Sequence, residues 1–303
     1  MTPRTVVVTG ANAGLGLACV RALLERGGDW QVVLAVRDIR RGGEALMRLP
    51  AAERCAAIEL DLASLASVRA FPERLDRAGV PPLHALVCNA GTQMTSPAHR
   101  SADGFELTFA VNHLGHFALV HGLRDRLVPP ARIVMVSSDT HDPRRSTGMP
   151  KPRYTSAAAL SLPDEEHTTS QAAARLGRER YTTSKLCNVL FAYELDRRLG
   201  EGARGIAVNA FNPGLMPGSG LARDYGALQR AAWRFLMPAL RVLPQVRGVR
   251  QSGRHLAALA ADPANEGVTG CYFDGLKPIR SSDDSYDREK AHDLWETSER
   301  LIA

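Results

Sequence analysis

The feature that most constrains the fold is a glycine-rich stretch near the start of the chain, Thr9-Gly10-Ala11-Asn12-Ala13-Gly14-Leu15-Gly16. It follows an apolar, β-branched run and precedes apolar residues at helical spacing. A strand, a glycine turn and a helix in this order can hold phosphate, because the first helical turn leaves backbone N–H groups unpaired. Gly10 permits a tight turn, Gly14 lets backbone approach a pyrophosphate, and Gly16 lets the helix pack on its strand. A glycine-rich hairpin is the alternative, and the flanking patterns favour the nucleotide turn.

Further apolar runs predict strands at residues 31–36, 55–60, 83–88, 131–136 and 268–273, with amphipathic segments between most of them. This alternation predicts an α/β fold, a Rossmann-type doubly wound parallel sheet of about seven strands with helices on both faces. The 303 residues suffice for one large domain, 1–303, although the length also allows two.

Several polar or glycine-containing positions directly follow these strands: Gly10, Arg37, Asp61 with Leu62, and Asn89-Ala90-Gly91. Ligands of a doubly wound sheet bind outside the carboxyl ends of its strands. Their shared position therefore predicts one ligand site.

Arg37 follows the second strand, about twenty residues after the glycine turn, where an NAD site places an acidic residue. Its planar guanidinium suits the 2′-phosphate of NADP instead. Asp38 is the better candidate for capping the next helix. A solvent-exposed arginine is the alternative reading, and the hypothesis we carry forward is NADP.

Composition excludes several other classes of protein. The net charge is +6, but the arginines are dispersed without interleaved aromatic residues, so nucleic-acid binding is not expected. Five widely spaced cysteines argue for a reducing compartment and against disulfides or a zinc site. No leader or membrane-length apolar run is evident, so we expect a cytoplasmic protein.

A segment rich in leucine and phenylalanine predicts a helix at about residues 104–127, which carries Asn112 and three histidines. Asn112 lies well inside it, and a satisfied core asparagine is its simplest interpretation. His113, His116 and His121 have no carboxylate or cysteine at ligand spacing. We therefore expect core or surface histidines and no metal site.

The predicted strand at 131–136 leads to Ser137-Ser138, and residues 139–180 then interrupt the alternation with prolines and charges. Tyr181 and Lys185 follow, four residues apart, and are expected on one face at the start of the next helix. An ammonium beside a phenol favours a pKa below the usual value of about 10. A chance pair on a surface helix is the alternative.

Together these motifs resemble the short-chain dehydrogenase/reductase superfamily: Thr9-Gly10 to Gly16, Asn89-Ala90-Gly91, Asn112, Ser138, Tyr181-x-x-x-Lys185 and Pro213-Gly214. The strings at 111–117 and 181–188 are similar to those of the branch that holds retinol dehydrogenases and light-dependent protochlorophyllide reductases. Residues 294–301 also resemble the end of the latter.

The resemblance implies hydride transfer between NADP(H) and a carbonyl or alcohol. It implies that Tyr181 is the acid/base, that Lys185 lowers its pKa and holds the nicotinamide ribose, that Ser138 polarises the substrate oxygen, and that Asn112 supports a proton relay. The implied cofactor-binding residues are Gly10, Asn12, Gly14, Leu15, Gly16, Arg37, Asp61, Leu62, Asn89, Ala90, Gly91, Tyr181, Lys185, Pro213 and Gly214.

Two other functions remain alternatives. Double-bond reduction of the protochlorophyllide type is weakened by Val36, where those enzymes usually have cysteine, and by Ser138. A non-catalytic NADP-binding regulatory or scaffold protein would not need the full set of proton-handling residues. Many members place a threonine after Pro213-Gly214. In the resemblance, that threonine contacts the nicotinamide amide. Here residues 215–219 read Leu-Met-Pro-Gly-Ser, which leaves open whether Ser219 makes the contact instead.

The insert 139–180 and the region 215–246 are expected to cover the substrate. Residues 221–243 contain an apolar stretch that is interrupted by Pro238 and consists of Trp233, Phe235, Leu236, Met237, Leu240 and Leu243. A hydrophobic small-molecule substrate follows if 221–243 lines the pocket. A docked helix pair and a membrane-surface contact are the alternatives. A homo-oligomer is also left open, and the charged tail 281–303 is expected to hold a short helix at about 287–301.

Overall fold

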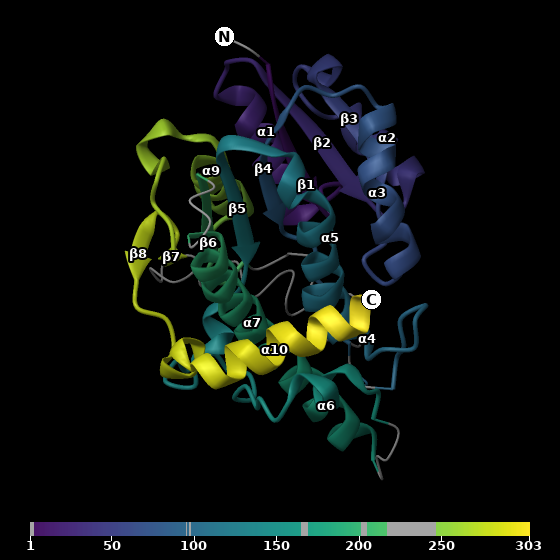
Figure 1. Cartoon of the computed structure of the whole chain (residues 1–303), viewed down its shortest axis with the longest axis vertical. Helices are drawn as coiled ribbons and strands as arrows, with labels where there is room; N and C mark the ends of the chain where they lie inside the picture. The colour runs from purple at the N-terminus through teal and green to yellow at the C-terminus, as the bar shows by residue number, and fades with distance from the viewer. Residues whose placement is uncertain (1–2, 95, 97, 165–168, 201–204, 217–246) are drawn as a thin grey trace.

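Eight strands form one sheet, and their order determines where ligands can bind. The computed structural model describes residues 3–94, 96, 98–164, 169–200, 205–216 and 247–303. The strand order is β3-β2-β1-β4-β5-β6-β7-β8 (Figure 1). The strands are β1 (Arg4–Thr9), β2 (Trp30–Val36), β3 (Cys55–Glu59), β4 (Leu83–Cys88), β5 (Leu127–Val136), β6 (Ile206–Asn212), β7 (Cys271–Asp274) and β8 (Lys277–Ile279). Neighbours are parallel except for β7 and β8, so the predicted doubly wound sheet is confirmed, with an additional antiparallel edge strand.

The strand order reverses between β1 and β4. The chain runs outward from β1 through β2 to β3, and then returns to place β4 on the other side of β1. Connections on the two sides of such a point leave toward opposite faces, which opens a crevice at the carboxyl ends of the strands. β1 ends at Thr9 and β4 at Cys88, so the glycine turn and the Asn89 run border this crevice.

Helices cover both faces of the sheet (Figure 1). They are α1 (Gly14–Glu25), α2 (Ile39–Leu46), α3 (Leu65–Arg77), α4 (Leu107–Phe109), α5 (Gly115–Leu123), α6 (Ala157–Ser161), α7 (Ser170–Gly200), α9 (Val249–Ala261) and α10 (Arg288–Ile302). The buried residues of α1, α2 and α9 form one apolar cluster with the sheet, and those of α3, α5 and α7 form the other. α10 crosses α7 and matches the helix expected at 287–301 (Figure 1).

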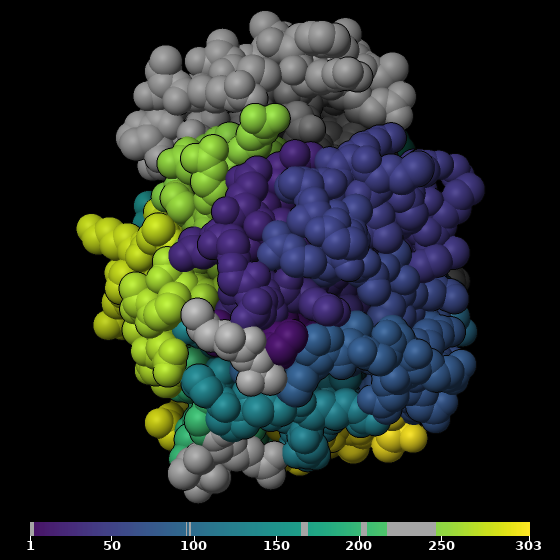
Figure 2. Space-filling view, turned by 90° about the horizontal axis from the view of Figure 1, so that it is seen from above, coloured from purple at the N-terminus to yellow at the C-terminus, as the bar shows by residue number. Residues whose placement is uncertain are grey.

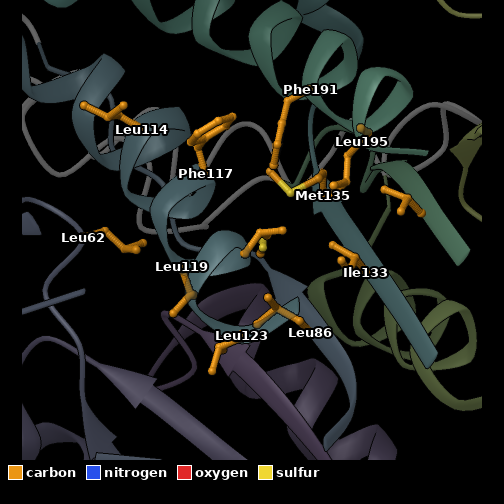
Figure 3. Packing of buried hydrophobic residues seen from close by; sticks show 14 of the residues in the cluster. Leu62, Leu86, Leu114, Phe117, Leu119, Leu123, Ile133, Met135, Phe191 and Leu195 are labelled. Carbon is orange, nitrogen blue, oxygen red and sulfur yellow. The ribbon is translucent and has the colours of Figure 1, made fainter. Parts of the chain in front are cut away.

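The larger core lies between the sheet and the α3–α5–α7 layer. Figure 3 shows Phe191 of α7 directed toward Met135 of β5, and Phe117 of α5 and Ile133 of β5 belong to the same cluster. All four side chains are at most 2% exposed. Because the sheet is also buried on its other face, the strands are continuous apolar runs without alternation.

The helix that carries Tyr181 begins much earlier than predicted. The predicted start is Tyr181, whereas α7 begins at Ser170, within the predicted insert 139–180. Residues 170–180 are rich in alanine and arginine, which favour helix even where the charged side chains suggest a solvent-exposed loop. Tyr181 therefore lies in the interior of a long helix, where its backbone is held on both sides.

The helix predicted at 104–127 is shorter and is not uniform. It begins at Leu107 because the Glu106 carboxylate accepts hydrogen bonds from the N–H groups of Thr108 and Phe109, at 3.0 and 2.6 Å. A π-helical turn at Ala110–Leu114 separates α4 from α5. The helix ends before Leu127, which is the first residue of β5. Apolar periodicity does not reveal a π turn, because the same residues fit either helix.

α1 and α9 pack so closely that one contact requires glycine. In Figure 2 the lime surface of α9 borders the purple surface of α1. A Cβ on Gly253 of α9 would lie 2.6 Å from both the backbone carbon and the Cβ of Ala18. Any side chain at Gly253 therefore forces the two helices apart.

We expect Gly253→Ala to lower the free energy of unfolding by about 1–3 kcal/mol, as overpacked cores do. Gly43→Ala is the matched control, because a Cβ on this residue of α2 would meet no atom within 4 Å. That control should stabilise by about 0.5–1 kcal/mol, since alanine loses less backbone entropy in a helix than glycine. Urea unfolding of both variants measures the difference, and two equal effects would refute the packing argument.

Within the described ranges, no helix combines the length and the apolar character needed to cross a bilayer. All five cysteines are free thiols, and those at 19, 88 and 187 are buried.

Candidate active site

The hydroxyl of Thr9 joins the glycine turn to the end of β4. Its Oγ1 accepts hydrogen bonds from the backbone N–H groups of Asn89 and Ala90, both at 2.9 Å. The Asn89 Nδ2 also donates to the Thr9 carbonyl at 2.7 Å. These bonds bring the predicted cofactor residues of β1 and β4 onto one rim of the crevice.

The glycine turn has the geometry expected of a phosphate cradle. Gly10 and Gly14 have φ angles of 64° and 56°, in the left-handed region that side chains rarely adopt. A Cβ on Gly16 would lie 2.7 Å from the Gly10 carbonyl oxygen, so α1 and its strand approach as closely as predicted. Within the part of the chain that the structure describes, no side-chain hydrogen bond caps the N-terminus of α1, which leaves its first N–H groups available to an anion.

The ends of β2 and β3 carry the predicted adenosine-side residues. Arg37 is exposed at the end of β2. Asp38 instead caps α2, where its Oδ1 accepts the Arg41 N–H at 3.1 Å, as the sequence predicted. Asp61 accepts the Ala63 N–H at 3.0 Å in the turn that contains the buried Leu62. Arg37 thus carries an exposed positive charge at this edge, together with Arg40 and Arg41 of α2, while the Asp38 carboxylate is engaged in the cap.

Tyr181 and Lys185 lie one turn apart on α7 and are both buried. The Lys185 Nζ is 5.5 Å from the centroid of the Tyr181 ring and donates a hydrogen bond to the Val136 carbonyl at 3.2 Å. The Ser137 hydroxyl in turn donates to the Lys185 carbonyl at 2.7 Å. These bonds fix this turn of α7 against the end of β5. Burial lowers the pKa of Lys185 from 10.5 to about 8.

Asn112 lies in the π turn and joins the loop after β4 to α7. Its Oδ1 accepts the Thr92 N–H at 2.7 Å, and its Nδ2 donates to the Thr92 carbonyl and to the Ser184 hydroxyl, both at 2.9 Å. The side chain is completely buried, as predicted.

Gly91 shows how closely these groups approach one another. A Cβ on Gly91 would lie 3.3 Å from the Asn112 Oδ1 and 3.5 Å from the Lys185 Nζ. Asn112, Lys185 and the Asn89-Ala90-Gly91 run therefore meet at one point, beside the glycine turn.

Ser138 lies at the end of β5, next to this meeting point. Its hydroxyl donates to the Asp139 Oδ1 at 3.1 Å and accepts the Thr140 N–H at 3.3 Å. The Asn212 Oδ1 accepts the N–H groups of both Asp139 and Gly214, at 3.3 and 3.0 Å, and so joins the loops after β5 and β6.

Pro213 and Gly214 follow β6 at the same edge of the sheet. The Pro213 carbonyl accepts the Ser252 hydroxyl of α9 at 2.7 Å, and Gly214 has a φ of 78°. Ser219 and the apolar run 221–243 lie outside the described residues.

His116 belongs to this network, although the sequence analysis gave it no role. Its Nε2 is 2.9 Å from the Thr9 hydroxyl, and its Nδ1 is 3.2 Å from the Asn112 carbonyl. Because that carbonyl can only accept, Nδ1 carries the proton and Nε2 accepts from Thr9. Burial, with a smaller effect of Lys185, lowers the pKa of His116 to about 4, so the ring is neutral. The 107 residues between Thr9 and His116 hide this contact from sequence reasoning.

The other two histidines of the α5 region pack among aromatic residues. His113 contacts the Ser298 hydroxyl at 2.9 Å, and the His121 ring stacks on Phe117 with centroids 4.5 Å apart. Among the residues that the structure describes, no three His, Cys, Asp or Glu side chains are grouped as a metal site would require.

The chain is similar to known proteins in both sequence and structure. A family model described as short chain dehydrogenase matches residues 4–150. The chain is 38% identical over 310 residues to the WW domain-containing oxidoreductase of Pongo abelii, covering 99% of this chain and 68% of that protein. It is 34% identical over 317 residues to the chloroplastic protochlorophyllide reductase A of Oryza sativa subsp. japonica, covering 98% and 80%. A crystal structure of a Mycobacterium paratuberculosis protein matches with a TM-score of 0.71 and 30% identity, covering 99% of this chain and 95% of that one.

Proposed function

Because the chain belongs to the short-chain dehydrogenase family, we propose that it transfers a hydride between NADP(H) and the carbonyl or alcohol of a hydrophobic substrate. One observation carries this proposal: Asn112 and Lys185 meet beside Gly91, with the Tyr181 ring 5.5 Å from the Lys185 Nζ, at the carboxyl edge that also presents the glycine turn. Carbonyl reduction needs a cofactor cradle that brings the hydride to the carbonyl carbon and a proton donor within reach of the adjoining oxygen. The protein is an oxidoreductase of this family.

The residues of the crevice fit a dinucleotide. The uncapped N-terminus of α1 and the left-handed Gly10 and Gly14 suit a pyrophosphate, because backbone N–H groups and the helix dipole favour an anion. Gly91 keeps space free beside Lys185, which lets the ammonium reach a ribose hydroxyl. When bound, the nicotinamide supplies or accepts the hydride.

The proton is handled by the chain itself. Tyr181 gives its phenolic proton to the substrate oxygen during reduction, or takes one during oxidation. The charge of the Lys185 Nζ favours the phenolate, and Val136 and Ser137 hold this turn of α7 in place. The Ser138 hydroxyl now donates to Asp139, and a substrate oxygen would replace that carboxylate as its acceptor.

Arg37 is proposed to select NADP by pairing with the 2′-phosphate. Arg37→Ala should raise the Kd for NADPH about ten- to a hundredfold, because a charge-assisted hydrogen bond contributes about 1.5–3 kcal/mol. The Kd for NADH should change by less than about twofold. Fluorescence titration with both reduced cofactors measures this. Arg40→Ala is the control, since exposed Arg40 pairs with Glu44 on α2. Equal or tighter binding of NADH by the unaltered protein would refute the assignment.

A second candidate is reduction of a carbon–carbon double bond, as the name of the Oryza sativa relative indicates for that protein. Ser138 favours the carbonyl reaction, because a hydroxyl at the proton-donor side is suited to polarise a substrate oxygen. Product analysis by mass spectrometry and NMR distinguishes the two, since an enone would yield either an allylic alcohol or a saturated ketone.

The hydrophobic substrate is inferred from the insert 139–180 and the apolar run 221–243, of which the second lies outside the described residues. We propose one cofactor-binding domain over 1–303, with 139–180 and 215–246 next to the substrate. NADPH consumption with lipid-like and polycyclic aldehydes, ketones and quinones tests this proposal. Efficient turnover restricted to small polyols would refute the substrate class, and no turnover with any compound would favour a binding protein.

A further inference from the structure

His141 bridges the end of β5 and a C-terminal segment that is distant in sequence. Its Nδ1 lies 2.6 Å from the Ser138 carbonyl oxygen, and its Nε2 lies 3.1 Å from the backbone nitrogen of Ser282. The ring packs against Tyr272 of β7, with centroids 4.7 Å apart. His141 and Ser282 are at most 1% exposed, so water does not compete for these bonds.

The two backbone partners define the tautomer of His141. The Ser138 carbonyl can only accept, so Nδ1 must carry a proton. The Ser282 N–H can only donate, so Nε2 must be free of one. The bridge therefore requires the neutral ring, and a second proton on Nε2 would face the Ser282 N–H.

The C-terminal side of this bridge is held rigidly. The Arg144 guanidinium pairs with Asp142 at 3.0 Å and donates to the Ser281 carbonyl at 3.0 Å. The Ser281 hydroxyl contacts the Tyr193 hydroxyl of α7 at 2.7 Å. The segment that receives His141 is thus fixed to the loop after β5 and to the helix that carries Tyr181.

We infer that His141 is a positioning residue for the reaction, which holds the backbone of Ser138 against the C-terminal segment 281–285. The inference rests on the proposed function, in which Ser138 polarises the substrate oxygen. The reason is geometric: His141 fixes the Ser138 carbonyl, and with it the origin of the Ser138 side chain. A hydroxyl displaced by a fraction of an ångström loses alignment with the reacting oxygen.

The charges around the ring are compatible with a neutral bridge. Burial lowers the pKa of His141 below its usual value, and it outweighs the carboxylates of Asp142 and Asp139, which raise it. Arg144 lowers it further. Tyr272, on the opposite side, is an uncharged phenol whose pKa burial raises.

Ser282→Pro tests the bridge because the proline Cδ replaces the N–H that points at the His141 Nε2, which removes the donor and displaces the ring. The Ser282 φ of −63° is one that proline adopts, and the Ser282 hydroxyl has no hydrogen-bond partner among the described residues. Ser282→Ala is the matched variant, since it loses the same hydroxyl but keeps the N–H. We expect kcat to be about tenfold lower in S282P than in S282A, which is the rate equivalent of one hydrogen bond. The KM for NADPH should agree within about twofold, because the bridge is separate from the glycine turn.

A second arm needs no turnover. NMR titration of the labelled His141 ring should give a higher pKa in S282P than in S282A, because the N–H donor favours the neutral ring. Equal ring pKa values, or equal kcat values, would overturn the inference. If S282P does not fold, His141→Phe keeps the packing on Tyr272 and should lower kcat at least as much. A wild-type kcat in H141F would equally overturn it.

The experiment separates this inference from the proposed function. If the double variant H141F/S282A has the same kcat as H141F/S282P, the N–H acts through His141, and the inference is supported. If Tyr181→Phe retained full turnover in the same assay, the proposed chemistry would be wrong, while the ring titration would still report on the bridge.

Discussion

Tyr181→Phe is expected to reduce kcat by about 10²–10⁴-fold, the usual contribution of a positioned acid–base group, while NADPH still binds. The variant removes one oxygen from a ring that is 5% exposed, so packing is retained. Steady-state kinetics combined with cofactor titration separates the two effects. The Kd for NADPH should change by less than about threefold, because the phenol makes a smaller contribution to cofactor binding than the glycine turn.

Tyr154→Phe is the matched control for that variant. Tyr154 lies in the insert 139–180, but its hydroxyl donates a partly buried hydrogen bond to Asp293 of α10 at 2.7 Å, so it is engaged by the C-terminal helix and not by the Tyr181–Lys185 pair. Its loss should affect stability and leave kcat within about twofold of wild type. Similar losses of kcat in both variants would indicate a general structural effect and would contradict an acid–base role for Tyr181.

Lys185→Met is expected to lower kcat about a hundredfold or more and, at the same time, to raise the melting temperature. The Lys185 Nζ is buried and donates to the Val136 carbonyl. Removing its charge from water lowers the free energy of unfolding, because one hydrogen bond does not replace the lost hydration. Methionine has a similar shape and no charge to desolvate. A lower melting temperature in K185M would contradict this account of the site.

The pH dependence gives a second measurement on the same variant. Burial lowers the pKa of Lys185 to about 8 in the folded chain, compared with about 10.5 when unfolded. Between these values the unfolded chain binds more protons, so this group makes the protein more stable as pH rises from about 8 to 10.5. The stability of wild type relative to K185M should therefore increase across that window and stay constant below it. Urea unfolding at several pH values measures the difference.

The sheet could be predicted because its strands are buried on both faces. Runs such as Thr5-Val6-Val7-Val8 carry a signal that does not depend on knowing their partners, whereas the order of the strands across the sheet comes from the structure alone. The start of α7 was missed because charged residues were read as loop. The π turn at Asn112 was missed because hydrophobic spacing does not distinguish a π turn from an α turn.

The residues proposed for the chemistry could be named from the sequence, because their spacing forms a motif. The groups that hold them could not. His116 contacts Thr9, and His141 contacts Ser282, across 107 and 141 residues. These contacts form only when the tertiary structure brings distant residues together. A histidine whose ring binds two backbone or hydroxyl groups is not marked by any pattern in the neighbouring sequence. Sequence alone thus identifies which side chains could react, and the structure shows what keeps them in place.

α10 has a consequence for the order in which the protein can mature. Trp295 of this helix packs on Phe117 and Phe191, with ring centroids 5.1 and 5.9 Å away, and so covers the outer side of α5 and α7. During translation, the helix that carries Tyr181 emerges from the ribosome long before α10 exists. Until α10 is made, the apolar outer side of this helix stays exposed to solvent. Nascent chains with exposed apolar surface bind chaperones or aggregate. The nucleotide turn is therefore synthesised well before the α10 residues that complete the packing around α5 and α7.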